Sequence, residues 1–125
     1  MHVTHAALPH LVTGGGGRII NITYIAASVG IPRLAVYSAS KGAIVSFTKA
    51  LAMELWPASI TVNCVSPGLI GDDEAQPTQG TFLGRTGTPA DVAATVAFLA
   101  SDAAAYTTGV EYLVDGGRVL GPRGS

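Results

Sequence analysis

Charged residues are scarce in this chain, and neither sign dominates. The sequence holds 7 Lys and Arg against 8 Asp and Glu, which gives a formal net charge of −1. It contains no cluster of basic residues, and binding to nucleic acid or to an anionic membrane surface depends on such a cluster. We therefore expect neither a nucleic acid nor a membrane as the main partner.

Cysteine and long apolar runs are also lacking. The single cysteine, Cys64, excludes a disulfide within the chain and fits a reducing compartment. The first residues carry three histidines instead of the basic segment of a signal peptide. No uncharged apolar run reaches the roughly 20 residues that span a bilayer. These absences predict a cytoplasmic protein.

The residues that are present alternate between helix and strand patterns. Hydrophobic residues make up 48% of the 125 residues, as in one small globular domain. We expect helices over 1–12, 38–55 and 88–101, strands over 18–27 and 59–68, and a third strand with a turn over 107–117. Strands separated by helical crossovers pair in parallel, with helices over the sheet. The sequence predicts an α/β fold with about three parallel strands and helices on both faces.

The third helix has a clear start signal. Thr88 is a good cap, Pro89 suits the first helical turn, and Asp91 follows Thr88 by three residues, which predicts a capping box. The preceding segment, residues 69–87, is polar and rich in glycine, so we expect a loop there.

Four consecutive glycines at 14–17 do not form a dinucleotide fingerprint. The pattern G-x-G-x-x-G would need glycine where the chain has Ile19 or Ile20. A phosphate loop also follows a strand and opens a helix, whereas this run follows an expected helix and leads into an expected strand. We interpret it as a flexible connection.

Tyr37 and Lys41 lie four residues apart in "YSASKGA", at the start of an expected helix. On a helix the two side chains are one turn apart on the same face. A lysine ammonium held against a phenol stabilises the phenolate, so such a pair suits acid/base work. The spacing alone also fits two ordinary amphipathic helix residues.

The surrounding motifs are more specific than the pair. "YSASKGAIVSFTKALAMEL" follows "GRIINI" and precedes "ITVNCVSPGLI", and "GRTGTPADVAATVAFLASD" and "TGVEYLVDGG" come after them. In this order the motifs resemble the classical short-chain dehydrogenase/reductase family over nearly the whole chain. The resemblance implies a Rossmann-type fold and an oxidoreductase that uses NAD or NADP as cofactor. It also implies hydride transfer between the nicotinamide and a small-molecule ketone or secondary alcohol.

The resemblance assigns roles to particular residues. Tyr37 matches the catalytic tyrosine, which gives a proton to the carbonyl oxygen or takes one from the alcohol. Lys41 matches the catalytic lysine, which assists that tyrosine and binds the nicotinamide ribose. Pro67, Gly68 and Ile70 match the stretch whose backbone lines the nicotinamide. A strand that ends in Pro-Gly at the carboxyl edge of a parallel sheet lies where open α/β sheets bind ligands.

The family's N-terminal half has no counterpart in the sequence. That half holds the glycine-rich pyrophosphate loop and the residue that selects NAD or NADP. We expect residues 1–125 to form a single partial domain, the C-terminal half of the family's Rossmann fold, starting inside the helix before the fifth strand.

Individual positions also depart from the family pattern. The catalytic serine falls at Tyr24, which we place on the substrate side of the site. Thr23 keeps a neighbouring hydroxyl, but on a strand it would point to the opposite face. A threonine near the nicotinamide is replaced by Asp72. The loop between Gly68 and Arg85 is shorter and more polar than the family's substrate lid.

Histidines near the start of the chain raise the question of a metal. His2 and His5 share a helix face, and His10 follows. No carboxylate or thiol lies near them in the sequence, and a zinc site needs more ligands than they supply. We predict surface histidines and no metal site.

The helix over 38–55 suggests self-association. One stripe is expected to face the sheet and the cofactor: Tyr37, Lys41, Ile44, Thr48, Leu51 and Leu55. The remaining surface is mostly small: Ala39, Gly42, Ala43, Ser46, Ala50 and Met53. Small residues let a second helix approach closely, and members of the family commonly dimerise through this helix. The strand over 18–27 would also have one bare edge. We expect a homo-oligomer.

The primary hypothesis is that the protein is an oxidoreductase of the family that the motifs resemble. Two alternatives stay open: a catalytically inactive remnant that acts as a packing or oligomerisation module, and a fragment of a longer enzyme. The residues that determine substrate, cofactor preference and reaction direction are missing or altered.

Overall fold

Three parallel strands form one sheet in the computed structural model, which describes residues 1–121. The helices and strands are α1 (His2–Thr13), β1 (Gly17–Ile22), α2 (Ala35–Leu55), β2 (Ile60–Pro67), α3 (Pro89–Ala100) and β3 (Glu111–Val114). Short 3-10 turns are η1 (Ile25–Ala27), η2 (Trp56–Ala58), η3 (Asp102–Ala104) and η4 (Arg118–Leu120). This order confirms the alternation expected from the sequence.

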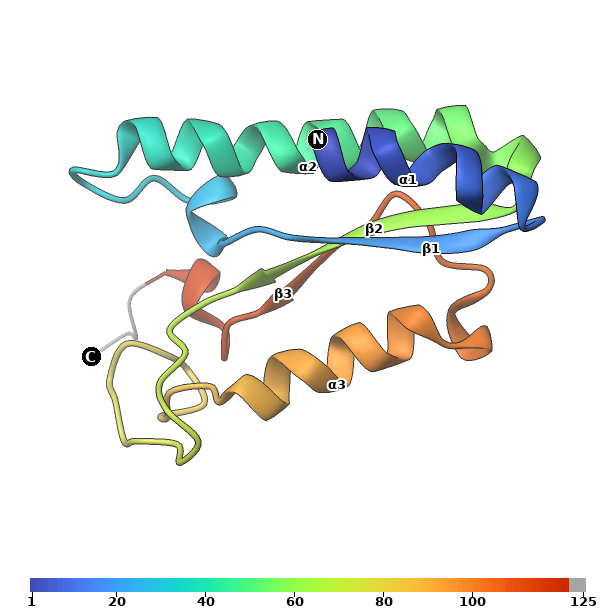
Figure 1. Cartoon of the computed structure of the whole chain (residues 1–125). Coiled ribbons are helices and arrows are strands. Elements are labelled where there is room, and N and C mark those ends of the chain that lie inside the picture. The colour runs from blue at the N-terminus through green and yellow to red at the C-terminus, as the bar shows by residue number, and fades with distance from the viewer. Residues whose placement is uncertain (122–125) are drawn as a thin grey trace.

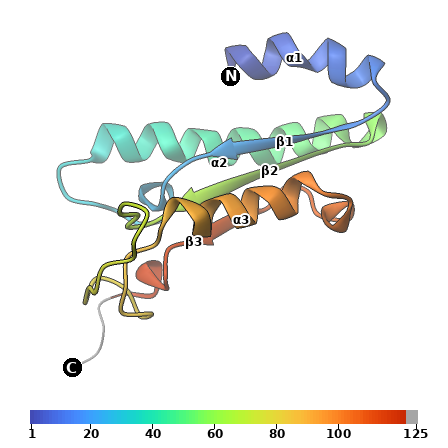
Figure 2. The same ribbon diagram turned by 60° about the horizontal axis from the view of Figure 1, so that its bottom comes forward.

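The sheet has the strand order β1-β2-β3. Gly17 pairs with Ile60 where β1 and β2 begin, and Cys64 pairs with Glu111 where β3 joins. Helices α1 and α2 lie on one face and α3 on the other (Figure 1). In Figure 2, α1 is drawn apart from both α2 and β1, which lie over each other in that view. The predicted α/β fold with helices on both faces is confirmed.

The central strand β2 holds the two apolar layers together. Ile60 and Val62 pack against Leu51 of α2, and α1 adds Leu8 and Leu11 at the margin of this cluster. On the other face, Val65 packs against Leu99 and Ala104. Burying each of these larger apolar side chains contributes roughly 1.5–3 kcal/mol. A strand covered on both faces needs apolar residues in both directions, which explains the nearly continuous apolar pattern of β2.

Strand β1 is shorter than the apolar pattern over 18–27 predicts. It ends at Ile22, and the next turn is the 3-10 turn η1. The Thr23 N–H still donates to the Val65 C=O of β2 at 2.8 Å, and the chain turns away from the sheet after it. Helix α2 begins at Ala35, three residues before the expected start.

The start of α3 confirms the predicted capping box. Thr88 Oγ1 accepts from the Asp91 N–H at 3.3 Å, and Asp91 Oδ2 accepts from the Thr88 N–H at 2.9 Å. The Arg85 guanidinium adds two bonds to the Asp91 carboxylate, at 2.7 and 3.2 Å. Together these bonds fix the end of the loop that precedes α3.

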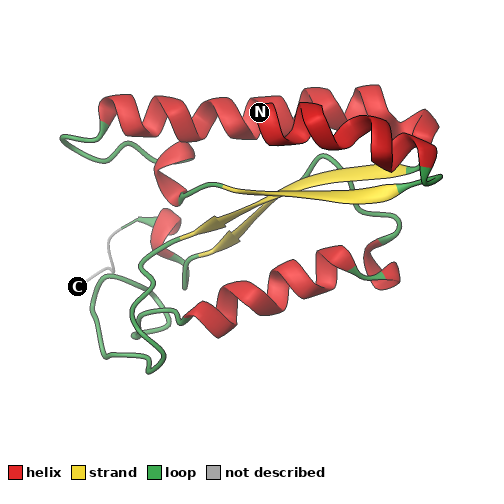
Figure 3. Ribbon diagram, viewed as in Figure 1, coloured by secondary structure: helices red, strands yellow, loops and turns green. Residues whose placement is uncertain are grey.

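The glycine run connects α1 to β1, as expected. Gly14 ends α1, and Gly15 and Gly16 have φ values of 79° and 148°, which favour glycine. Figure 3 shows this connection at the edge where the strands begin, opposite the arrowheads. The run therefore lies far from the carboxyl edge of the sheet.

Neither a membrane span nor a metal cluster is found in the part of the chain that the structure describes. Within residues 1–121, no helix has the length and apolar character needed to cross a bilayer. Over the same residues, no group of three or more His, Cys, Asp or Glu side chains is placed to hold a metal ion.

Candidate functional site

The residues singled out from the sequence gather at the carboxyl edge of the sheet. Tyr24 follows the end of β1, and residues 67–70 follow the end of β2. Tyr37 and Lys41 stand in the first turns of α2, whose N-terminus lies at the same edge (Figure 1). Parallel strands end at one edge, which brings together segments that are distant in sequence.

The tyrosine and lysine of α2 are in contact. The Lys41 Nζ lies 5.5 Å from the centroid of the Tyr37 ring, in cation–π geometry. The Tyr37 side chain is 43% exposed, so a small molecule can reach it. Its hydroxyl has no hydrogen-bond partner among residues 1–121 and is available to a ligand.

Tyr24 joins this pair from the other side. The rings of Tyr24 and Tyr37 meet edge to face, with centroids 5.8 Å apart and planes inclined by 66°. The Tyr24 hydroxyl also lacks a hydrogen-bond partner within the described residues. Two free phenols and an ammonium group therefore lie side by side at the carboxyl edge.

A hydrogen-bond network that the sequence reasoning missed supports the Tyr24 loop. Thr23 Oγ1 lies 3.4 Å from Ser66 Oγ, which donates to Glu111 Oε1 at 2.6 Å. Ser28 Oγ donates to the same carboxylate oxygen at 2.8 Å. The network links the ends of β1 and β2 to the first residue of β3. The sequence alone does not predict this network, because it depends on the register of β2 with β3, which places Glu111 opposite Cys64.

The loop after β2 is held in a close-packed position. A Cβ added to Gly68 would lie 2.7 Å from the Asp115 Cβ, so only glycine fits there. Leu69 and Gly71 exchange backbone hydrogen bonds with Gly87, both at 2.9 Å. Ile70 lies between them, and its N–H and C=O have no partner among residues 1–121.

Three cavities open around these segments. The proline–glycine cavity, about 540 Å³, is lined by Thr23, Tyr24, Pro67, Gly68, Leu69, Ile70, Pro89 and Val92. The tyrosine–arginine cavity, about 440 Å³, is lined by Tyr24, Ile25, Val29, Gly30, Ile31, Pro32, Leu69, Gly80, Arg118, Val119 and Gly121. Tyr24 and Leu69 line both cavities.

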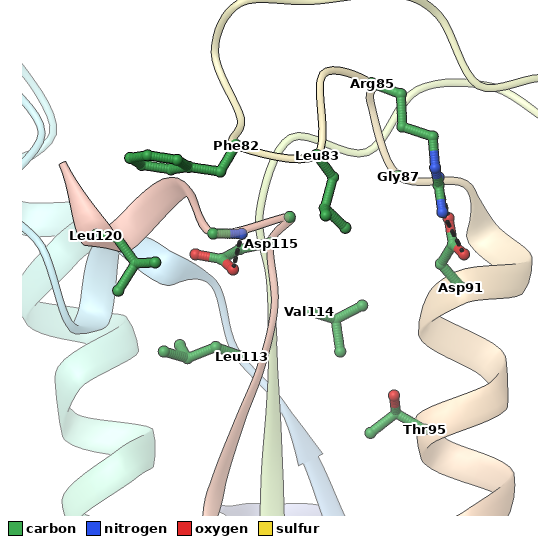
Figure 4. Close-up of a pocket in the computed structure, with 12 residues that line it drawn as sticks. Phe82, Leu83, Arg85, Gly87, Asp91, Thr95, Leu113, Val114, Asp115 and Leu120 are labelled. Atoms are coloured by element: carbon green, nitrogen blue, oxygen red, sulfur yellow. Dashed lines mark hydrogen bonds and ion pairs between the residues drawn. The ribbon is translucent and has the colours of Figure 1, made fainter. Parts of the chain in front are cut away.

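The third cavity, about 520 Å³, lies between α3, β3 and the loop before α3. In Figure 4 the Leu83 and Val114 side chains point into it, and the Arg85–Asp91 ion pair forms one wall. None of the residues predicted for the site lines this cavity. Asp72, expected near the nicotinamide, is exposed and lines none of the three cavities.

Helix α2 is tied to the sheet by a short polar chain. Asn21 Nδ2 donates to Thr48 Oγ1 at 2.9 Å, and Thr48 is hydrogen-bonded to Cys64. Burial raises the pKa of the Cys64 thiol, since a thiolate would lose its hydration there. Cys64 is therefore a buried structural thiol rather than a nucleophile.

This arrangement suits proton transfer to an oxygen atom. A phenol beside an ammonium group can give a proton to a carbonyl oxygen or take one from an alcohol. The unpaired N–H and C=O of Ile70 suit a planar amide, which offers one acceptor and one donor. The wall of the tyrosine–arginine cavity is mostly apolar, as in small-molecule sites.

Comparison with known proteins identifies the family. The family model described as enoyl-(acyl carrier protein) reductase matches residues 1–118. A 3-oxoacyl-[acyl-carrier-protein] reductase from Synechocystis sp. is 49% identical over 111 residues, covering 83% of this chain and 45% of the relative. An L-fucose dehydrogenase from Mus musculus is 42% identical, covering 92% of this chain and 47% of the relative. The chain spans about half the length of the curated relatives it matches.

Solved structures agree with these relatives. An acetoin dehydrogenase from Salmonella typhimurium superposes with a TM-score of 0.92 at 36% identity, covering 98% of this chain and 53% of that chain. A short-chain type dehydrogenase/reductase from Mycobacterium ulcerans superposes with a TM-score of 0.89 at 34% identity, covering 99% of this chain and 49% of that chain. The relatives named here are oxidoreductases. This chain belongs to the short-chain dehydrogenase/reductase family.

Proposed function

We propose that the protein is an NAD(P)-dependent oxidoreductase that interconverts a small ketone and a secondary alcohol. The observation that carries this proposal is the contact of Tyr37 with both Lys41 and Tyr24 at the carboxyl edge of the sheet. The names of the relatives, all reductases or dehydrogenases, support the reaction class.

In this proposal Tyr37 is the acid and base of the reaction. Its free hydroxyl gives a proton to the carbonyl oxygen during reduction and takes one from the alcohol during oxidation. Lys41 places a positive charge beside the Tyr37 ring. Its ammonium group has no hydrogen-bond partner among residues 1–121, so it is also free to bind the ribose of a nicotinamide nucleotide.

The proline–glycine cavity fits the nicotinamide end of the cofactor. Its volume of about 540 Å³ lies within the range of small-molecule sites. Ile70 offers a backbone N–H and C=O to the carboxamide, while Pro67 and Gly68 form the adjoining wall. When bound, the cofactor supplies or accepts the hydride. We found no cradle for its pyrophosphate among residues 1–121, because the glycine run lies at the opposite edge.

The chain is, on this proposal, one partial domain that corresponds to the C-terminal half of the family's Rossmann fold. Its relatives are about twice as long, which supports this view. The free edge of β1 also supports it, because an apolar strand such as "GRIINI" suits a partner on both sides.

Tyr24 belongs to the substrate side in this proposal. It separates the proline–glycine cavity from the tyrosine–arginine cavity, and its free hydroxyl can donate to the substrate oxygen. A phenol carries that donor further from the backbone than a serine does, so the ring takes space that a substrate would otherwise use.

The experiment is to fuse the N-terminal half of the Synechocystis relative to this chain. Oxidation of NADPH and of NADH is then followed with a panel of small ketones. We expect turnover, and we expect Tyr37→Phe to reduce it roughly 100-fold or more, because the ring stays while the proton source is removed. A fusion that binds cofactor but reduces no ketone, or a fully active Tyr37→Phe variant, would overturn the proposal.

A second candidate function is a packing or oligomerisation module without catalysis. The outer face of α2 favours it, because Ala39, Ala43, Ser46, Ala50 and Met53 are all exposed. The cytoplasmic location and the homo-oligomer expected from the sequence stay predictions.

A further inference from the structure

Arg118 is the only charged residue that lines the tyrosine–arginine cavity, within the part of the chain that the structure describes. Apart from Arg118 and Tyr24, the wall is made of aliphatic side chains, proline and glycine. An apolar cavity with one cation selects a ligand that carries one negative charge on an apolar body.

The Arg118 guanidinium has no acceptor among residues 1–121. The ion pairs among these residues are Arg18–Asp102 and Arg85–Asp91. Asp115, three residues before Arg118, does not bond the guanidinium; its two carboxylate oxygens accept the N–H groups of Gly117 and Val119 at 2.9 and 2.8 Å. The charge of Arg118 is therefore available to a ligand.

The cavity adjoins the proposed reaction centre through Tyr24, although Tyr37 does not itself line it. Its wall includes Tyr24, whose ring meets Tyr37 edge to face. The η1 and η4 turns, which carry Ile25 and Arg118, lie near each other at the carboxyl end of the sheet (Figure 1). One ligand in this cavity can contact Tyr24 and Arg118 together. The acidic run at 72–74 lies outside the cavity wall.

We propose that the tyrosine–arginine cavity binds an oxo acid or its hydroxy acid, with the carboxylate on Arg118 and the carbonyl or hydroxyl group beside Tyr24 and Tyr37. The guanidinium offers two parallel N–H groups, which match a carboxylate. This inference rests on the proposed function for the reaction, and it adds the substrate class and the residue that selects it.

The test measures binding without cofactor, so that it is independent of hydride transfer. The isotope-labelled chain is titrated with levulinate (4-oxopentanoate) and, separately, with its neutral methyl ester, and amide NMR shifts are followed. We expect levulinate to shift the amides of Gly30, Ile31 and Val119 and to bind about tenfold more tightly than the ester, because a hydrogen bond to a charged group is worth about that much.

Arg118→Gln should bring the acid and the ester to equal affinity. Arg33→Gln is the matched control, because Arg33 is also exposed but does not line the cavity. Arg118 is itself exposed, so the variant should keep the amide spectrum of the folded chain.

Three results would overturn the inference: equal binding of acid and ester by the unaltered chain, a preference that survives in Arg118→Gln, or shifts confined to residues outside the cavity. Failure of the proposed function leads to a different result. In that case the fusion enzyme reduces no ketone, while the acid preference and its dependence on Arg118 remain.

Discussion

The ring of Tyr24 meets the ring of Tyr37 edge to face, with centroids 5.8 Å apart. Tyr24 is the second residue after β1 and Tyr37 stands in the first turn of α2, and η1 lies between them in the chain. In the proposed function, Tyr24 puts a bulky phenol where the family resemblance expects a short serine. The residue beside the proposed acid therefore also limits the space for a substrate.

Replacing Tyr24 by serine should raise the turnover of the fusion enzyme. Tyr24→Ser restores a short donor and opens the wall between the two cavities that Tyr24 lines. Initial rates with small ketones are the measurement. Tyr106→Ser is the control, because Tyr106 is fully exposed, and it should leave the rate unchanged. A lower rate in Tyr24→Ser would show that the phenol itself takes part in the reaction.

The 125-residue chain alone should bind NAD(H) and NADP(H) no more tightly than about millimolar. Its described residues offer the proposed nicotinamide cavity but no cradle of backbone N–H groups for the pyrophosphate, which usually supplies much of the affinity. Isothermal titration with each nucleotide tests this expectation. Micromolar binding of either one would mean that the chain builds a phosphate site of another kind.

The chain should associate into a dimer or a larger assembly through the outer face of α2. The structure favours Ala43 over Gly42 as the residue to replace. Gly42 is half-buried and a Cβ there would approach the Ala27 carbonyl, whereas Ala43 is exposed. Ala43→Arg should therefore weaken association by steric clash and buried charge.

Sedimentation equilibrium at low micromolar concentration measures this association. Ala93→Arg is the control for added charge, because Ala93 is exposed and lies on another element, α3. A folded, soluble monomer formed by the unaltered chain would contradict the prediction.

Acid should weaken the start of α3 through Asp91. The hydrogen bonds from the Arg85 guanidinium, with further bonds from Thr88, hold the pKa of Asp91 well below its usual range. Because the pKa of Asp91 is lower in the folded chain than in the unfolded chain, the carboxylate contributes its full stabilisation above the ordinary carboxyl pKa of about 3.9. This contribution is lost as the pH falls through the folded pKa. The difference in melting temperature between the unaltered chain and Asp91→Asn should shrink between about pH 5 and about pH 2.

The exposed Asp72 provides the control for this titration. It has no hydrogen-bond or ion-pair partner among residues 1–121, so Asp72→Asn should follow the curve of the unaltered chain. A difference between the unaltered chain and Asp91→Asn that stays constant with pH would show that the Arg85–Asp91 pair contributes nothing through its charge.

The order of helices and strands, the capping box of α3 and the family could all be predicted from the sequence. These features depend on local periodicity and on short motifs: the apolar run "ITVNCV" predicts a buried strand whatever surrounds it, and the spacing of Thr88 and Asp91 predicts their two bonds. The end of β1 was not predictable, because apolar residues continue to Ala27 while the chain turns at Thr23.

Only the tertiary structure decided which side chains meet. The sequence placed Tyr37 beside Lys41, since one helical turn separates them, and placed Tyr24 near the substrate only by family resemblance. The edge-to-face contact of Tyr24 with Tyr37, the Glu111–Ser66 hydrogen bond and the shared cavity of Tyr24 and Arg118 each join segments that are far apart in the chain. Such contacts are set by strand register and by the common edge at which parallel strands end, and neither is encoded in any single stretch of residues.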